Sequence, residues 1–96
     1  MKIKIERRYS SNTRLEGEAE SFKEFVVKNK SDLSGSDLSN SDLSNSDLRG
    51  SDLRGSDLRG SNLRGSDLSN SDLRWAKIKA GQKDELLQAL RIEIVD

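Results

Sequence analysis

Ionisable side chains recur at a fixed spacing in the middle of the chain, and their types limit the chemistry that they could perform. From residue 31 to residue 75, nine consecutive blocks of five residues carry aspartate or asparagine at the second position and serine or arginine at the fourth. Regularly placed carboxylates would suit calcium, because hard cations prefer clustered oxygen ligands. Regularly placed arginines would suit the phosphates of a nucleic acid.

A solvated, salt-bridged surface explains both sets better than either ligand does. In five of the nine blocks an arginine follows the acidic or amide residue by two positions, so a cation lies beside the candidate metal ligand. Trp75 is the only aromatic residue near these arginines, which leaves no platform for stacking bases. We therefore expect no metal and no nucleic acid. The residues assigned to a face open to an unidentified protein partner are Arg49, Arg54, Arg59, Arg64, Arg74, Asp52, Asp57 and Asp67.

The composition argues against an enzyme. The chain of 96 residues contains no Cys and no His, which removes disulfides, thiolate nucleophiles and the side chain most used for proton transfer near neutral pH. The regular blocks also hold no unevenly spaced set of nucleophile, base and orienting group. We expect no catalytic residue and no cofactor.

Charge and hydropathy predict a cytoplasmic protein without a membrane partner. Lys and Arg together number 17, and so do Asp and Glu. The longest unbroken apolar run is residues 25–27, far shorter than a membrane span or the apolar region of a signal peptide.

Leucine occupies the third position of every block and is the expected core. Within a block, small, charged, apolar and polar residues alternate, as in a short strand with serine and leucine on the inner side. The fifth residue is mostly Gly or Asn, which tolerate positive φ, so each block can end in a corner. Such units stack into a coil whose turns hydrogen-bond at roughly 4.8 Å. The core positions are Leu33, Leu38, Leu43, Leu48, Leu53, Leu58, Leu63, Leu68 and Leu73.

These blocks resemble the pentapeptide-repeat family, whose units read Ala-Asp/Asn-Leu-x-x. The resemblance implies a right-handed quadrilateral β-helix, and therefore an all-β fold with short helical caps. It extends to residues 76–80, a tenth unit with Ile78 at the core position. If four units make one coil, residues 20 apart share a column, and Arg54 lies diagonally to Asp72.

One departure from the family pattern is systematic. The inward small residue is Ser rather than Ala in all nine blocks, from Ser31 to Ser71. A buried hydroxyl without a partner costs about 1–3 kcal/mol. We expect all nine hydroxyls to be satisfied by backbone carbonyls or by each other.

The chain is predicted to form one compact domain with a cap at each end of the stack, because a bare coil end exposes leucines and backbone groups. The predicted segments are an N-terminal cap at residues 1–30, the repeats at residues 31–80 and a C-terminal cap at residues 81–96. In the N-terminal cap, residues 2–6 and 14–19 alternate like the strands of a hairpin around a turn at residues 10–13.

Short helices are predicted next to the repeats on both sides. Ser21 and Glu24 form a capping box that begins a helix ending near Lys28. After Gly81, residues 82–90 read as a second helix and residues 91–96 as a final strand. Two interpretations stay open for the apolar residues of this end. They either seal the last coil or form a homodimer contact, and they are Trp75, Leu86, Leu87 and Leu90.

The resemblance also suggests a function, the antagonism or protection of DNA gyrase by a long acidic β-helix that imitates duplex DNA. Ten units make about 2.5 coils, or roughly 12 Å of stack. Duplex DNA of that length carries about seven negative charges. The five basic and eight acidic residues of positions 31–75 give only −3. A non-enzymatic scaffold or protein-interaction module is therefore preferred, with gyrase modulation as the alternative.

Overall fold

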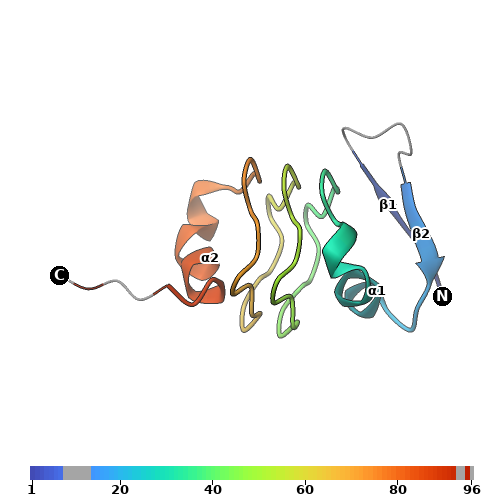
Figure 1. Ribbon diagram of the computed structural model, residues 1–96, viewed down its shortest axis with the longest axis horizontal. Coiled ribbons are helices and arrows are strands. Elements are labelled where there is room, and N and C mark those ends of the chain that lie inside the picture. Colours follow the sequence, from blue (N-terminus) through green and yellow to red (C-terminus); the bar gives the residue numbers. More distant parts are fainter. Residues whose placement is uncertain (8–13, 93–94, 96) are drawn as a thin grey trace.

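A computed structural model describes residues 1–7, 14–92 and 95. It shows a stack of coils with β1, β2 and α1 at one end and α2 at the other (Figure 1). The regular strands of the described residues are β1 (Lys2–Glu6) and β2 (Arg14–Glu18), and the α-helices are α1 (Phe22–Lys28) and α2 (Lys83–Ala89). Within the described part of the chain, none of the helices is long and apolar enough to cross a membrane.

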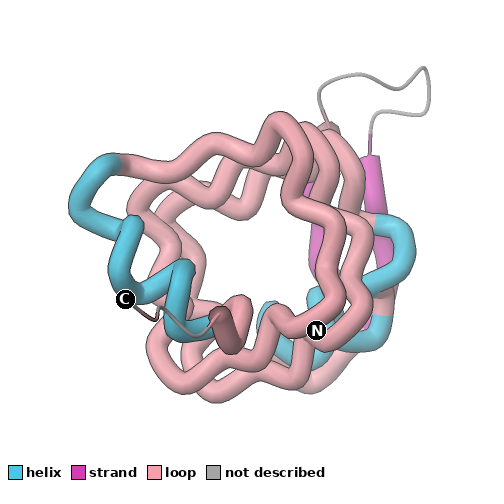
Figure 2. The backbone as a smooth tube through the Cα atoms, turned by 60° about the vertical axis from the view of Figure 1, so that its left-hand side comes forward, coloured by secondary structure: helices cyan, strands magenta, loops and turns pink. Residues whose placement is uncertain are grey.

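The repeats wind with twenty residues in each turn. Parallel bridges join residues 20 apart, including Asp37 with Asp57 and Asp57 with Lys77. Backbone bonds hold successive turns together, and the Leu38 amide donates to the Asp57 carbonyl at 2.9 Å. Figure 2 shows the turns lying one behind another along the stack. Four blocks therefore make one coil, and residues 20 apart share a column as predicted. The diagonal contact expected between Arg54 and Asp72 forms at 3.8 Å.

The sides of the coil are too short to be continuous strands. Each bridged position is a single residue between two turns, because the fifth residue of every block bends the chain. All nine of these residues have φ between 58° and 76°, as expected for corners. Eight of them are Gly or Asn, which tolerate this region, and the ninth is Trp75 with φ of 62°.

The core is formed by the repeat leucines, which point inward along the stack axis. Eight of the nine repeat leucines expose at most 1% of their surface. Leu73 departs from the expectation that all nine are buried, and the tenth core position, Ile78, is also only partly buried. Both belong to the last turns of the stack, where no further coil lies above them.

The inward serines show one departure at the start of the stack. Ser31 is exposed, although the alternation within its block predicts an inward side chain. A 3-10 helix at Lys30–Asp32 replaces the extended backbone there, so the alternation of inner and outer side chains has not yet begun.

At the N-terminal end, β1 and β2 pair antiparallel, and Ile3 and Ile5 of β1 are buried. The turn expected at residues 10–13 lies outside the described residues. Helix α1 begins after Ser21, whose hydroxyl accepts the Glu24 amide at 3.1 Å. The Glu24 carboxylate reaches back to the Glu20 amide at 3.2 Å. Phe25 and Val26 on α1 are buried.

At the C-terminal end, a 3-10 helix at Ala80–Gln82 leads into α2. The final strand predicted at residues 91–96 is not seen in its described residues. Arg91 has φ of 58°, and Ile92 and Val95 are exposed and belong to no strand. The left-handed Arg91 turns the chain away from the extended conformation that a strand would need. The other residues of that prediction lie outside the described ones.

Candidate interaction surface

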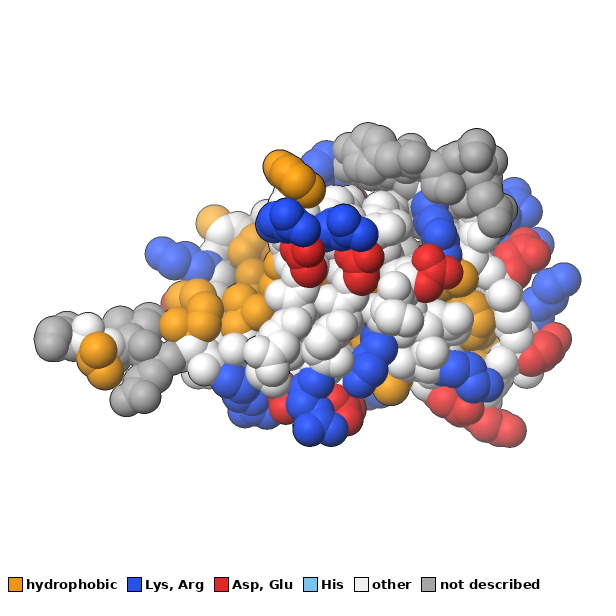
Figure 3. Space-filling model, in the orientation of Figure 1, with side chains coloured by type: hydrophobic (Ala, Val, Ile, Leu, Met, Phe, Trp, Pro, Cys, Tyr) orange, Lys and Arg blue, Asp and Glu red, His pale blue; other side chains and the backbone are white. Residues whose placement is uncertain are grey.

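The arginines of the repeats fold back onto the aspartates of their own blocks. The Arg49 guanidinium donates to both carboxylate oxygens of Asp47, each at 2.8 Å. The same two-bond arrangement pairs Arg54 with Asp52, Arg59 with Asp57 and Arg74 with Asp72. Figure 3 shows acidic and basic side chains in contact on one side of the stack. Because these four carboxylates have a cation in their own block, their charge is already compensated within the chain.

Blocks with serine at the fourth position use the hydroxyl in the same way. Ser39 donates to the Asp37 carboxylate at 2.6 Å, and Ser44 donates to Asp42 at 2.5 Å. The outward aspartates therefore have local donors whether the fourth residue is Ser or Arg. Among the described residues, no group of three or more acidic side chains could hold a metal ion.

These bonds keep the carboxylates ionised well below neutral pH. The hydrogen bond from the Arg74 guanidinium lowers the pKa of Asp72 to about 2. The bond from Arg54 lowers the pKa of Asp52, and the Ser69 amide lowers the pKa of Asp67. Each of these donors stabilises the charged form of the acid more than the neutral form.

The predicted interaction face does not exist as one surface. The twenty-residue register places Asp52, Arg54 and Arg74 on one side of the stack. The others lie on three further sides: Arg59 with Asp57, Arg64 with Asn62, and Arg49 with Asp67. Four blocks in each coil necessarily point in four directions.

Two residues of the predicted face differ in their surroundings. Asp57 is 4% exposed, so it is not available to a partner. It lies in the middle turn, bridged to both Asp37 and Lys77, with the Arg59 guanidinium across its carboxylate at 2.7 Å. Arg64 comes two residues after Asn62 rather than after an aspartate, and within the described part of the chain its guanidinium forms no ion pair.

Trp75 is the outward residue that breaks the repeat pattern. Its indole is 76% exposed, so it does not seal the last coil. The Arg74 guanidinium lies 5.5 Å from the ring centroid, within the range of a cation–π contact. A hollow of about 530 Å³ beside it is lined by Ser34, Arg54, Gly55 and Trp75. A left-handed backbone at a bulky residue costs roughly 1–2 kcal/mol, which is the kind of strain that accumulates at functional positions.

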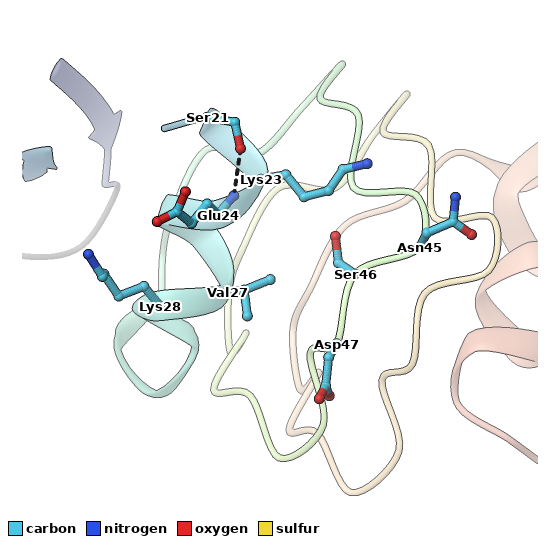
Figure 4. Close-up of a pocket in the computed structure, with 8 residues that line it drawn as sticks. All are labelled: Ser21, Lys23, Glu24, Val27, Lys28, Asn45, Ser46 and Asp47. Carbon is cyan, nitrogen blue, oxygen red and sulfur yellow. Dashed lines mark hydrogen bonds between the residues drawn. The ribbon is translucent and has the colours of Figure 1, made fainter. Parts of the chain in front are cut away.

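A second hollow lies between α1 and the repeats. It measures about 400 Å³, and Figure 4 shows the side chains that line it: Ser21, Lys23, Glu24, Val27, Lys28, Asn45, Ser46 and Asp47. Lys23 donates to the Ser44 hydroxyl at 3.3 Å and lies 3.9 Å from the Asp42 carboxylate. Lys23 therefore joins the N-terminal cap to the stack. No sequence pattern predicted this hollow, because only the fold brings α1 and the repeats together here.

The repeat register seen in the coils is also recognised in the sequence by a family model. The model for pentapeptide repeats matches eight copies, at residues 29–55 and 46–79, which together exceed half of the chain. The chain belongs to the pentapeptide-repeat family. No curated protein and no solved structure matches it.

Serine at the inward position gives this pentapeptide-repeat stack an unusual interior. Some hydroxyls are satisfied as expected: Ser61 and Ser66 donate to the Leu58 and Leu63 carbonyls at 2.7 and 2.6 Å. Ser51 and Ser71 bond to each other at 2.9 Å. The expectation that all are satisfied is wrong for three buried hydroxyls, which have no hydrogen-bond partner among the described residues: Ser36, Ser46 and Ser56. The Leu33 and Leu53 carbonyls accept the Ser36 and Ser56 amides but not their hydroxyls, unlike the Leu58 and Leu63 carbonyls.

The C-terminal cap of the pentapeptide-repeat stack is partly polar. Gln82 is buried and accepts the Gly60 amide at 3.0 Å while donating to the Leu58 and Ser61 carbonyls at 2.8 and 2.9 Å. The Glu85 carboxylate accepts the Leu63 amide. Leu86, Leu87 and Leu90 are partly buried, and Leu86 and Leu90 pack against the core. The cap was predicted from its leucines, but its polar residues also close the coil.

Proposed function

We propose that this protein is a non-enzymatic scaffold whose repeats form the right-handed, four-sided β-helix of the family and which binds a protein partner. The twenty-residue register and the corner at the end of every block support the four-sided section. A stack tied by hydrogen bonds between successive coils is stiff enough to present side chains at fixed positions.

Trp75 is the observation that carries the binding role. Tryptophan is enriched at the energetically dominant positions of protein interfaces. Here the indole is 76% exposed at a strained corner, beside the paired charges of Arg54 and Arg74. A residue kept only for folding would be Gly or Asn, as at the other eight corners.

Affinity capture with two matched variants tests this role. Trp75→Gly restores the residue found at five other corners, and Arg64→Ala removes an outward side chain on another side of the stack. A protein captured by the native chain and by Arg64→Ala, but lost with Trp75→Gly, is the expected result. Thermal unfolding of both variants verifies that they remain folded. Equal capture by all three chains would remove Trp75 from the binding surface.

A further inference from the structure

Three sides of the last coil are bonded at least in part by the segments that follow it, and one is not bonded at all within the described residues. The backbone amides of the bonded sides donate to residues 77–89: Leu58 to Lys77, Gly60 to Gln82, Leu63 to Glu85 and Leu68 to Ala89. On the fourth side, residues 71–75, neither the Leu73 amide nor the Trp75 amide donates a hydrogen bond within the described residues. This side is called the open side below.

The coil beneath shows what the open side can bind. One turn earlier on the same side, the Leu53 amide donates to the Asp72 carbonyl at 2.9 Å and the Gly55 amide donates to the Arg74 carbonyl at 2.8 Å. The Ser51 carbonyl accepts the Asp72 amide at 2.9 Å. The open side presents the equivalent three groups unpaired. They require the carbonyls of two residues spaced two apart, together with the N–H of the first of those residues, which is the backbone of an extended peptide.

The side chains of the open side favour an apolar, uncharged segment. Leu73 is only partly buried, whereas Leu53 directly below it is 1% exposed. Trp75 exposes its indole at the end of the same side. On the same side, the Asp72 carboxylate is already held by the Arg74 guanidinium at 2.7 Å, so no charge on a ligand is needed to compensate it.

We propose that the open side binds an extended, uncharged segment of a partner protein, which adds one strand to the stack and covers Leu73 and Trp75. Addition of a strand to an exposed edge is a general mode of peptide recognition, in which main-chain bonds supply affinity and side-chain contacts supply specificity. The segment continues the ladder that already joins residues 51–55 to residues 71–75. At the opposite end of the stack the N-terminal cap lies against the first coil (Figure 1), where the Asp37 and Asp52 amides donate to the Glu6 and Lys30 carbonyls. This inference rests on the proposed binding role and names the class of partner.

The test uses the full chain and a capped, uncharged heptapeptide in which threonine and valine alternate around a central tyrosine. Trp75 is the single tryptophan of the chain, so its fluorescence reports the open side directly. We expect a saturable fluorescence change below about 1 mM peptide, with slower hydrogen exchange at the amides of Leu73 and Trp75. The amide of Leu58, which already donates to Lys77, serves as the internal reference. Trp75→Gly is expected to weaken binding about tenfold, measured by calorimetry.

A matched control peptide carries N-methyl groups on the amides that face the stack. The methyl groups remove the N–H donor and sterically block the approach of the main chain, while the side chains are unchanged. Equal binding of this peptide would overturn the proposal, and so would no binding of the first peptide at 1 mM. Protection of both amides without peptide would also overturn it. If that protection is lost on dilution, the occupant of the open side is a second copy of the chain, bound in a C-terminal homodimer. Loss on removal of residues 91–96 would identify the chain's own tail. Because the assay uses purified protein, its failure leaves the capture result with Trp75→Gly unaffected.

Discussion

Replacing the unpaired buried serines by alanine should stabilise the protein. Ser36 and Ser56 are both 0% exposed, and neither hydroxyl has a hydrogen-bond partner among the described residues. A buried, unsatisfied hydroxyl costs about 1–3 kcal/mol. The same column carries Ala76 one turn later, so the stack already accommodates alanine at this position. We expect Ser36→Ala and Ser56→Ala each to raise the free energy of unfolding by roughly 1–2 kcal/mol.

Two other serines provide a matched control of opposite sign. The hydroxyls of Ser61 and Ser66 donate to backbone carbonyls at 2.7 and 2.6 Å. Those carbonyls also accept the Ser61 and Ser66 amides, each at 3.1 Å, so they would not be left unsatisfied. Alanine at Ser66 therefore loses one ordinary hydrogen bond, worth about 0.5–1.5 kcal/mol. Alanine at Ser61 loses the same bond and also the longer one that its hydroxyl accepts from the Gln82 amide at 3.5 Å.

Urea and thermal unfolding of the four single variants decide the matter. In a domain of this size, 1 kcal/mol shifts the melting temperature by about 4–8 °C. The Ser36 and Ser56 variants should therefore melt above the native protein, and the Ser61 and Ser66 variants below it. Destabilisation by Ser36→Ala and Ser56→Ala, to the same extent as by the controls, would refute the reasoning. It would show that these hydroxyls do have partners in solution.

Four further outcomes are expected. Leu53→Ala should lower the free energy of unfolding by about 2–5 kcal/mol, seen in urea unfolding, because it opens a cavity between two leucines of the same column. Arg54→Glu should change it by less than about 1 kcal/mol, since this ion pair is half-exposed, and a larger loss would place the side chain in an interface. The folded-state pKa of Asp72 lies below its unfolded value, so its stabilising contribution is complete above about pH 4 and falls as the pH drops towards about 2; Asp72→Asn should flatten that part of the stability profile. Finally, the purified protein should not inhibit or protect gyrase supercoiling at micromolar concentration, and salt-sensitive inhibition lost on changing Asp52 and Asp67 to Asn would favour the DNA-mimic alternative.

The repeat predicted the regular part of the fold from particular residues. Leucine every fifth residue indicates the core column, and Gly or Asn at the block ends indicates the left-handed corners, because both depend on local geometry. The partly buried Leu73 and the exposed Ser31 depend instead on what lies beyond the first and last coils. Periodicity describes an endless stack, so it carries no information about the ends.

The candidate site was predictable in its residue types but not in its arrangement. Pairing of four of the five repeat arginines with an aspartate follows from their spacing, but the burial of Asp57 depends on coils twenty residues away. Trp75 was recognised as an apolar residue near the last coil, and its corner position was visible in the sequence. Its exposure was not, since a large apolar residue is usually buried. The open side emerges only when the bonds made by Gln82, Glu85 and Ala89 are known.

The pairing of Arg with Asp inside a single block bears on how such a chain can lengthen. In a block that carries both residues, the arginine is neutralised by the aspartate two residues earlier, so duplication of such a block adds no unbalanced charge at that site. Insertion of twenty residues would add one complete turn and keep α2 above the same sides of the stack. Insertion of only five would move α2 and Trp75 by one side, a quarter of a turn around the axis. The number of inserted blocks therefore determines which side of the stack α2 and Trp75 lie on. The leucine core stays the same.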